Sequence, residues 1–411
     1  MIVVGGGAAG MFSAGTAAGF GARVALIDHA DRLGKKLNIT GKGRCNVTND
    51  SGPDEVLKNI PHNGRFLFSA LNGFPPERAM EFFESRGVRL KVERGRRVFP
   101  ESDRAMDITA ALEGFLRSSG VKILHGSVKS LIVEDGALCG VRTAAEEFEA
   151  PRVIICTGGC SYPATGSDGS GYHLAEQAGH TVALPVGSLV PLEEDGCFCA
   201  QMQGLSLRNV AVKLTDAKNK TVFSDFGELL FTHFGLSGPT ILSASAHMKQ
   251  DVGYTVHIDL KPALDEAALD ARLLREFEQA QNKNAANVFG SLYPRALIPV
   301  MLERSGIDAQ TKANSITRAQ RRALLALTKD FTVPVAGRRP VREAIVTRGG
   351  VRTSEVDPKT MESKKLPGLY FAGEVLDVDA YTGGFNLQIA WSTAFSAGNA
   401  AGRAGTKQEL D

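Results

Sequence analysis

The segment from residue 366 to residue 401 constrains the fold of this chain more than any other. It reads as an apolar strand, a glycine-rich turn and a long helix of small residues, LPGLYFAGEVLDVDAYTGGFNLQIAWSTAFSAGNAA. Gly383 and Gly384 in the turn lack a Cβ, so their backbone N–H groups can approach a ligand closely. Phe385 opens the helix, where unpaired N–H donors and the helix dipole favour an acceptor that gains negative charge during reaction. The pyrimidine edge of a flavin is such an acceptor.

A second glycine-rich turn follows the first apolar strand. Residues 1–4 are apolar, GGGAAG occupies residues 5–10, and Asp28 follows the strand expected at residues 23–27. This is the dinucleotide-binding fingerprint, in which glycines allow the pyrophosphate to approach and an acid about 20 residues later binds a ribose hydroxyl. We therefore predict that this turn binds a nucleotide.

The two distant turns decide between nicotinamide and flavin as the resident cofactor. A nicotinamide dehydrogenase needs no second glycine-rich helix start, whereas FAD is long and has two ends to hold, so the two ends of the chain must fold together. A third segment agrees, because an apolar strand at residues 152–156 runs into Thr157, Gly158 and Gly159. No second G-x-G-x-x-G turn with its own acid is present, so we expect NADH or NADPH to be only a transient reductant.

The residue pattern changes in the middle of the chain. Up to about residue 188 strands alternate with helices, from about 190 to 260 the runs are short and β-rich, and residues 262–330 have mostly helical spacing. We therefore predict an α/β protein with a split Rossmann-like FAD-binding domain and an inserted substrate domain. The expected boundaries are 1–188 and 336–411 for the FAD-binding domain, and 189–335 for the insert, β-rich over 189–261 and helical over 262–335. The expected helices are 75–86, 103–119, 264–282, 293–305 and 317–328.

Composition excludes several other classes of protein. With 411 residues, 43% of them hydrophobic, the chain can build two or three domains with large cores. Its six cysteines lack the spacing of a disulfide framework or a zinc site, so we expect no metal. Glycines interrupt the N-terminal apolar segment and no run of about 18 apolar residues follows, so we expect a cytoplasmic protein that does not enter a membrane. The oligomeric state stays open.

Basic residues gather in two runs although the formal net charge is only +2. A solvated face is the ordinary explanation of such a run. If the two runs converged on one face, they would form a phosphate-binding surface suited to folded RNA. Their members are Arg86, Arg89, Lys91, Arg94, Arg96 and Arg97 in the first run, and Lys312, Arg318, Arg321, Arg322, Lys329, Arg338, Arg339 and Arg342 in the second.

Several ordered motifs identify a family resemblance over nearly the whole chain. Besides GGGAAG they are TGKGRCNVTN at 40–49, VFPESDRAMDI at 98–108, TGGCSYPATGSDGSGY at 157–172, SLVPL at 188–192, ELLFTHFGLSGPTIL at 228–242, VTRGGV at 346–351 and GLYFAGEVLDVDAYTGGFN at 368–386. In these motifs the chain resembles the bacterial flavoproteins of the aminoacetone oxidase-like or bile-acid-reductase-like group, relatives of the glutathione reductase superfamily. The resemblance implies an FAD-dependent oxidoreductase acting on a ribosomal-RNA uracil, a steroid-like enone or a small amine.

The residues expected to bind the cofactor lie in these glycine-rich motifs and the polar positions beside them. They are Gly5, Gly7, Ala8, Ala9, Gly10, Asp28, Lys36, Gly41, Gly43, Arg44, Thr157, Gly158, Gly159, Gly373, Glu374, Asp379, Gly383, Gly384, Phe385 and Asn386. We expect Asp379 to accept a hydrogen bond from a ribityl hydroxyl of the flavin.

A flavin carries hydride at N5, so the protein must supply a proton donor if the substrate is a conjugated C=C bond. Cys45, between Arg44 and Asn46, is the first candidate, although a free cysteine is as often a packing residue. Tyr162, Tyr381 and His233 compete with it, and Arg44 is expected to balance the pyrophosphate or a substrate oxyanion.

Three functions stay open from the sequence. The first is a reductase that uses NAD(P)H and passes hydride to an RNA uracil or an enone, and the basic runs favour RNA. The second is an oxygen-dependent oxidase of a small amine such as aminoacetone. The third is a flavin-bearing RNA-binding protein without catalysis.

Overall fold

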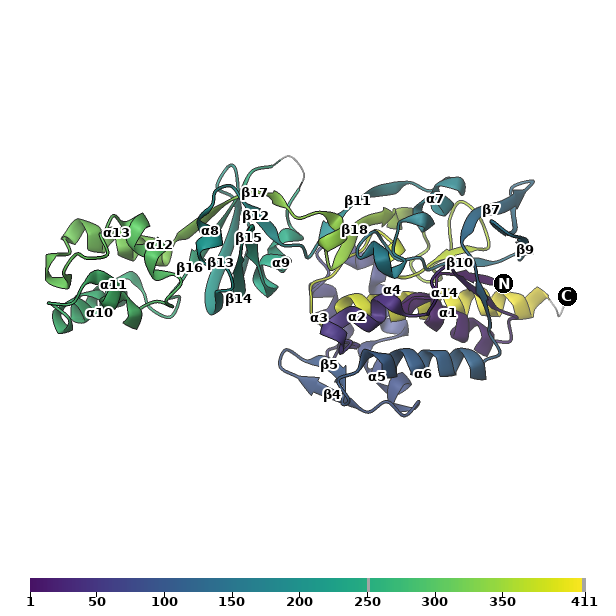
Figure 1. Ribbon diagram of the computed structural model, residues 1–411. Coiled ribbons are helices and arrows are strands. Elements are labelled where there is room, and N and C mark those ends of the chain that lie inside the picture. The colour runs from purple at the N-terminus through teal and green to yellow at the C-terminus, as the bar shows by residue number, and fades with distance from the viewer. Residues whose placement is uncertain (250–251, 409–411) are drawn as a thin grey trace. The chain divides into compact units, whose positions relative to one another are not determined.

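The computed structural model describes residues 1–249 and 252–408 (Figure 1). Contacts divide the chain into two compact units. Unit 1 comprises Met1–Ser188 and the chain from Val341 onward, and unit 2 comprises Leu189–Pro340.

Unit 1 is built on a five-stranded parallel sheet. Its order is β19 (Leu369–Phe371), β10 (Val153–Ile155), β1 (Ile2–Val4), β2 (Ala25–Asp28) and β6 (Lys122–His125). Three of its strands, β1, β10 and β19, are short apolar runs with buried side chains, as expected for a parallel sheet covered on both faces. This is the Rossmann-like α/β arrangement that the sequence predicts.

Two helices of small residues, α1 (Ala8–Gly19) and α14 (Phe385–Gln408), pack against each other beside this sheet (Figure 1). A Cβ added at Gly398 would lie 2.6 Å from the backbone oxygen of Ser13, and one added at Gly402 would lie 2.9 Å from the backbone oxygen of Ala17. The small residues therefore let a helix from the start of the chain touch one from near its end.

The remaining elements of unit 1 surround this core. The helices are α2 (Lys35–Gly43), α3 (Pro53–Lys58), α4 (Phe68–Gly73), α5 (Pro76–Glu84), α6 (Ala105–Ser118) and α7 (Ser170–Gln177). The small sheets are β3 (Thr48–Asn49), β5 (Arg97–Pro100) and β4 (Leu90–Glu93); β7 (Val128–Glu134), β8 (Ala137–Thr143) and β9 (Glu147–Glu149); and β11 (Val182–Ser188) with β18 (Val346–Val351).

Unit 2 contains a closed six-stranded barrel and a group of helices. The barrel order is β12 (Leu192–Glu194), β15 (Gly235–Ser237), β14 (Thr221–Thr232), β13 (Ser206–Asp216), β16 (Tyr254–Asp259) and β17 (Phe331–Arg338). The helices are α8 (Phe198–Gln201), α9 (Pro239–Ser245), α10 (Glu266–Gln279), α11 (Ala285–Val288), α12 (Ile298–Ser305) and α13 (Arg318–Lys329). Side chains of Phe231, Phe289 and Phe331 belong to its core.

One stretch of unit 2 differs from the sequence-based expectation. Residues from Phe331 onward form the last barrel strand, although we expected the helical part of the insert to reach residue 335. Phe331 and Val333 are buried while Pro334 is exposed, which is the alternation of a strand with one covered face.

No helix within the described ranges combines the length and the apolar composition needed to cross a bilayer.

Candidate cofactor and active site

The glycine turn after β1 brings three elements of unit 1 together. A Cβ added at Gly5 would lie 2.5 Å from the backbone oxygen of Cys156. A Cβ added at Gly10 would lie 1.7 Å from the backbone oxygen of Gly5. At Gly7 it would meet no atom within 4 Å. Gly7 is the N-cap of α1 and makes no side-chain capping bond. The start of this helix therefore presents an open cradle with unblocked N–H donors, which suits a pyrophosphate.

Asp28 closes the turn from the end of β2. Its carboxylate accepts hydrogen bonds from the N–H groups of Gly6 and, at 2.8 Å, Ala30. A carboxylate offers about four acceptor positions, so Asp28 can also take the ribose hydroxyl that the fingerprint predicts.

The third predicted segment contains an orphaned polar atom. Thr157 Oγ1 is buried and has no hydrogen-bond partner among the described residues. The next residue, Gly158, has a φ of +75°, and a Cβ at Gly159 would lie 2.4 Å from Thr347 Oγ1. The unpaired hydroxyl fits a polar cofactor group better than a purely structural turn, because buried polar atoms are normally paired.

The turn before α14 is held by residues from the motif TGKGRCNVTN at 40–49. Gly383 and Gly384 have φ values of +131° and +99°, and a Cβ at Gly384 would lie 2.2 Å from the Thr48 oxygen. Asn49 Nδ2 donates to the Gly383 oxygen at 2.9 Å. Asn386 Oδ1 accepts from Ala380 N at 2.9 Å. Only glycines fit this conformation, and both ends of the chain build it, as the sequence predicts.

The same motif is anchored along α14 by buried hydrogen bonds. Trp391 Nε1 donates to the Val47 oxygen at 2.9 Å, and Thr48 Oγ1 donates to Gln388 Oε1 at 2.6 Å. Residues 44–49 are therefore positioned by the helix whose N-terminus we expect at the flavin.

A polar network joins four separate segments of unit 1. Lys36 Nζ lies 2.6 Å from Glu374 Oε2 and 2.7 Å from Ser161 Oγ. Glu374 Oε1 accepts from Thr347 N at 2.9 Å and from Ser161 Oγ at 3.0 Å. Gly373, with a φ of +78°, would place a Cβ 2.8 Å from that of Ala9. The structure thus brings the predicted cofactor residues Lys36 and Glu374 together and ties their segment to α1.

Cys45, the first predicted proton donor, has no exposed surface and belongs to the hydrophobic core. Burial raises the pKa of its thiol to about 12. The thiol therefore keeps its proton at neutral pH. Its catalytic role stays a prediction.

Arg44 and the glycines on either side of Lys42 form the turn before Cys45. Gly41 and Gly43 have φ values of +56° and +83°. The Arg44 guanidinium pairs with Glu93, lies 2.6 Å from Asp103, and stacks at 4.1 Å over the Phe99 ring. This side chain is thus held against the β4–β5 hairpin.

The other candidates occupy different surroundings. Tyr162 has a φ of +53° and is 38% exposed. Tyr381 is half-buried, and its N–H donates to the Asn59 oxygen at 2.9 Å. His233 lies in unit 2. Asp379 is fully buried and faces His62 and Ser188.

Sequence reasoning missed three polar residues of this region, Ser161, Thr347 and His62. Ser161 and Thr347 stand inside the motifs at 157–172 and 346–351, so their position in a motif was a usable signal. Nothing in the sequence around His62 marks it, because its partner lies 317 residues away.

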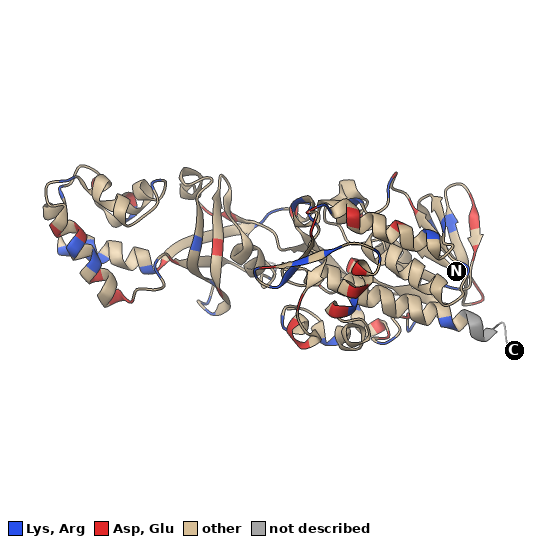
Figure 2. Cartoon of the chain, turned by 90° about the horizontal axis from the view of Figure 1, so that it is seen from below, with Lys and Arg blue, Asp and Glu red and all other residues tan. Residues whose placement is uncertain are grey.

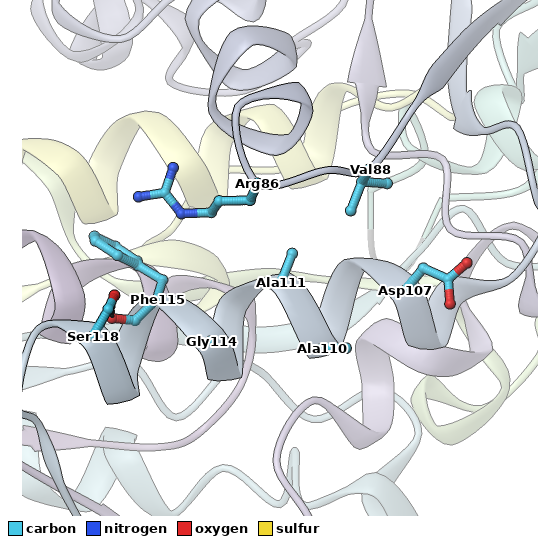
Figure 3. Close-up of a pocket in the computed structure, with 8 residues that line it drawn as sticks. All are labelled: Arg86, Val88, Asp107, Ala110, Ala111, Gly114, Phe115 and Ser118. Atoms are coloured by element: carbon cyan, nitrogen blue, oxygen red, sulfur yellow. Dashed lines mark hydrogen bonds between the residues drawn. The ribbon is translucent and has the colours of Figure 1, made fainter.

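A surface hollow on unit 1 lies apart from these residues (Figure 3). It is lined by Arg86, Val88 and one side of α6, and the Arg86 guanidinium lies 4.5 Å from the Phe115 ring centre. None of its lining residues is a predicted cofactor-binding or catalytic residue, so we assign it no function.

Comparison with known proteins gives matches over nearly the whole chain. The model of the HI0933-like protein Rossmann domain matches residues 1–400. The 3-dehydro-bile acid delta(4,6)-reductase of Clostridium scindens is 32% identical over 411 residues, covering 97% of this chain and 98% of that protein. The ribosomal RNA dihydrouridine synthase of Escherichia coli is 34% identical over 402 residues, covering 96% of each.

Two solved structures share the fold at low sequence identity. One is 3-ketosteroid delta1-dehydrogenase from Sterolibacterium denitrificans, with a TM-score of 0.51, 14% identity, and coverage of 98% of this chain and 99% of that chain. The other is 3-ketosteroid-delta4-(5alpha)-dehydrogenase from Rhodococcus jostii, with a TM-score of 0.50, 15% identity, and coverage of 98% and 96%. These likenesses support the fold alone.

Proposed function

We propose that this chain, which belongs to the HI0933-like protein Rossmann domain family of FAD-dependent oxidoreductases, is a reductase. It would add hydride and a proton across an activated C=C bond. One observation carries the proposal. Two relatives that match almost end to end are named as a reductase and as a dihydrouridine synthase, and both names describe the addition of hydrogen.

The residues of unit 1 fit FAD in this proposal. The turn at Gly5–Gly10 and Asp28 would hold the pyrophosphate and ribose, while the network around Glu374 and the N-terminus of α14 would hold the flavin end. When bound, the flavin supplies the hydride from N5, with NADH or NADPH as the proposed source of electrons. The protein's own tasks are to orient the acceptor, stabilise developing negative charge and hold a proton.

Among acceptors, we favour a uracil in ribosomal RNA over a bile-acid-like enone. The support is the β4–β5 hairpin, where Figure 2 shows basic residues close together. Arg94 and Arg96 are exposed there, and within the described ranges neither forms an ion pair. Exposed guanidinium groups on a projecting hairpin suit a phosphate backbone.

The second basic run is divided between the two units, because Arg342 belongs to unit 1 and the other members to unit 2. In unit 2 Arg321 pairs with Asp270 at 2.8 Å, Lys329 with Asp259 at 2.5 Å and Arg339 with Glu193 at 2.7 Å. We therefore base the RNA proposal on the hairpin of unit 1. A reaction on ribosomal RNA would place the protein in the cytoplasm.

Anaerobic half-reactions test the proposal. The purified FAD protein is reduced with NADPH, NADH or dithionite and then mixed separately with unmodified ribosomal RNA, a 3-keto-4-ene steroid acid, and oxygen. We expect rapid flavin reoxidation by RNA and little by oxygen. Reoxidation by the steroid alone would assign the enone as substrate. Fast reoxidation by oxygen alone with stoichiometric peroxide would establish an oxidase in place of a reductase. Tight RNA binding without any reoxidation would establish a non-catalytic RNA-binding protein.

A further inference from the structure

Two loops of unit 1 run antiparallel beside the glycine turn that precedes α14. His62 and Asp379 form an isolated antiparallel bridge, and Tyr381 N–H donates to the Asn59 oxygen at 2.9 Å. Asn63 Nδ2 donates to the Asp377 oxygen at 2.7 Å. Asp379 stands four residues before Gly383 in the sequence. The loop pairing therefore fixes His62 next to the segment that leads into the proposed flavin turn.

The partner of His62 is a buried carboxylate with no exposed surface. Asp379 Oδ1 lies 3.0 Å from His62 Nδ1, and Asp379 Oδ2 accepts from Ser188 Oγ at 2.5 Å. We assign the proton of this pair to His62 Nδ1, because a carboxylate accepts hydrogen bonds. Ser188 fixes the carboxylate from its other side, and the imidazole is thereby held in one orientation.

His62 differs from its partner in exposure. Its side chain is 32% exposed, whereas that of Asp379 is fully buried. One ring nitrogen is therefore engaged by the buried acid, and the other, Nε2, belongs to a side chain that solvent can reach. A histidine oriented by a carboxylate through one nitrogen and working through the other is the arrangement of many general acids and bases.

We propose that His62 is the proton donor of the reduction and that Asp379 is the residue that positions it. The inference rests on the proposed function of an activated C=C reductase. A bound reduced flavin would be the source of the hydride that one carbon of the double bond takes up. The His62 Nε2–H bond breaks, its electron pair stays on the imidazole, and the proton forms a C–H bond at the neighbouring carbon. The neutral imidazole regains a proton from water through its exposed edge.

Two carboxyl groups lie near His62. Asp379 pairs with it at 3.0 Å, and Asp377 is close enough for the two side chains to interact electrostatically. Burial raises the pKa of Asp377, hydrogen bonds from Asn63 and from the Gly349 N–H lower it, and the charges of Asp379 and His62 make smaller contributions of opposite sign.

Cys45 is the competing donor, and the two residues make different predictions. The Cys45 thiol has no exposed surface, and burial raises its pKa to about 12. A donor must reach its acceptor within about 3 Å and must be reprotonated after each turnover. His62 meets the second condition through its exposed edge.

The test uses the FAD-loaded protein and variants at both positions. The wild type, His62→Gln, Asp379→Asn, Cys45→Ala and the control His173→Gln are reduced anaerobically with dithionite and mixed with RNA or the enone. His173 is a suitable control because its side chain is 83% exposed on α7. We expect normal FAD content and reduction in His62→Gln, but reoxidation at least 100-fold slower. Asp379→Asn should be slower by about 10-fold or more, and the control His173→Gln should stay within about threefold. Cys45→Ala tests the competing donor.

Two further readouts separate catalysis from a structural role. The wild-type reoxidation rate should fall on the alkaline side, and His62→Gln should lose this limb of the pH profile. Nitrogen NMR of ring-labelled histidine should show the Nδ1–H tautomer for neutral His62 in the protein without cofactor, and a mixture in Asp379→Asn. His62→Asn and His62→Ala with added imidazole provide substitutes if His62→Gln fails to fold.

The assignment of His62 as proton donor would be overturned if His62→Gln reoxidised its flavin at the wild-type rate, or if only Cys45→Ala were slow. The reductase function would stand in either case. An Nε2–H tautomer in the wild type would overturn the positioning role of Asp379. If neither RNA nor the enone reoxidises the reduced flavin of the wild-type protein, the proposed function and this inference are both overturned.

Discussion

Lys36 and Glu374, which are 338 residues apart in the chain, form an ion pair with 2.6 Å between Nζ and Oε2. Both side chains are about one fifth exposed, at 20% and 21%. The pair joins the segment after the first glycine turn to the segment that leads to α14.

Lys36→Met should therefore weaken both folding and FAD binding. It leaves the Glu374 carboxylate without its cation, and we expect a loss of about 2 kcal/mol, below the ~3–5 kcal/mol typical of fully buried pairs. The FAD dissociation constant should rise by about tenfold or more, as measured by flavin fluorescence during reconstitution. The neighbouring Lys35→Met is the matched control, because Lys35 makes only a surface pair with Asp31 and should change stability by less than about 0.5 kcal/mol. Equal effects of the two substitutions would contradict the role of this network.

Gly384→Ala should abolish FAD binding. The added Cβ would lie 2.2 Å from the Thr48 oxygen at a φ of +99°, and we expect destabilisation by more than about 2 kcal/mol. Gly114→Ala in α6 is the control, because an added Cβ there meets nothing within 4 Å and should stabilise the helix by about 0.5–1 kcal/mol. Urea unfolding and the ratio of flavin to protein absorbance measure both effects. Full flavin content in Gly384→Ala would show that this turn does not approach the cofactor.

Acid should destabilise unit 1 through Glu355. Burial alone would raise the pKa of this carboxyl, but hydrogen bonds from Thr181 and Lys365 outweigh burial and lower the pKa from 4.5 to about 2. Because the folded pKa lies below the unfolded one, the stabilisation is fully present above about pH 4.5 and is lost as the pH falls toward 2. Glu355→Gln should be less stable than wild type at pH 7 and should lose less stability between pH 5 and pH 3. Urea midpoints across this range provide the measurement, with Glu134→Gln on the exposed β7 end as control; parallel curves for wild type and Glu355→Gln would disprove the assignment.

Arg94→Glu/Arg96→Glu should weaken RNA binding if the β4–β5 hairpin contacts phosphates. Each lost phosphate contact should reduce the slope of log affinity against log salt by about 0.7–0.9. Filter binding of a ribosomal-RNA fragment between 50 and 200 mM salt measures this slope. Lys122→Glu/Lys129→Glu, which reverses two exposed charges elsewhere in unit 1, is the control with equal net charge. The same slope in both double variants would place the RNA surface elsewhere, and steroid reduction should be unaffected in either.

The sequence was sufficient for the features that depend on local residue types. Gly5 and Gly384 are glycines because a Cβ would collide with backbone, so the motifs alone located both turns. The apolar runs located the central strands, because a parallel strand covered on both faces must be apolar throughout.

Features that depend on distant pairing were not predictable. Arg44 was expected near a pyrophosphate or an oxyanion, yet it pairs with Glu93 and Asp103, and only the folded hairpin brings those acids to it. His62 has no local signal, because the loop pairing that gives it Asp379 forms between segments 317 residues apart. The short barrel strands β12 and β15 have three residues each, too few for a periodicity to be recognised.

The packing of α1 against α14 also affects the order in which the molecule can be made. A ribosome delivers α1 early, but the helix that must cover it follows the whole of unit 2, which is continuous in the chain at Leu189–Pro340. At typical rates of synthesis the wait for that stretch alone is roughly 8 to 30 s. Unit 2 can complete its barrel during this time, whereas the first half of unit 1 must keep its apolar surface out of wrong contacts until the last segment emerges. Nascent chains stalled before residue 385 should therefore hold no FAD and should be the forms that most need a chaperone.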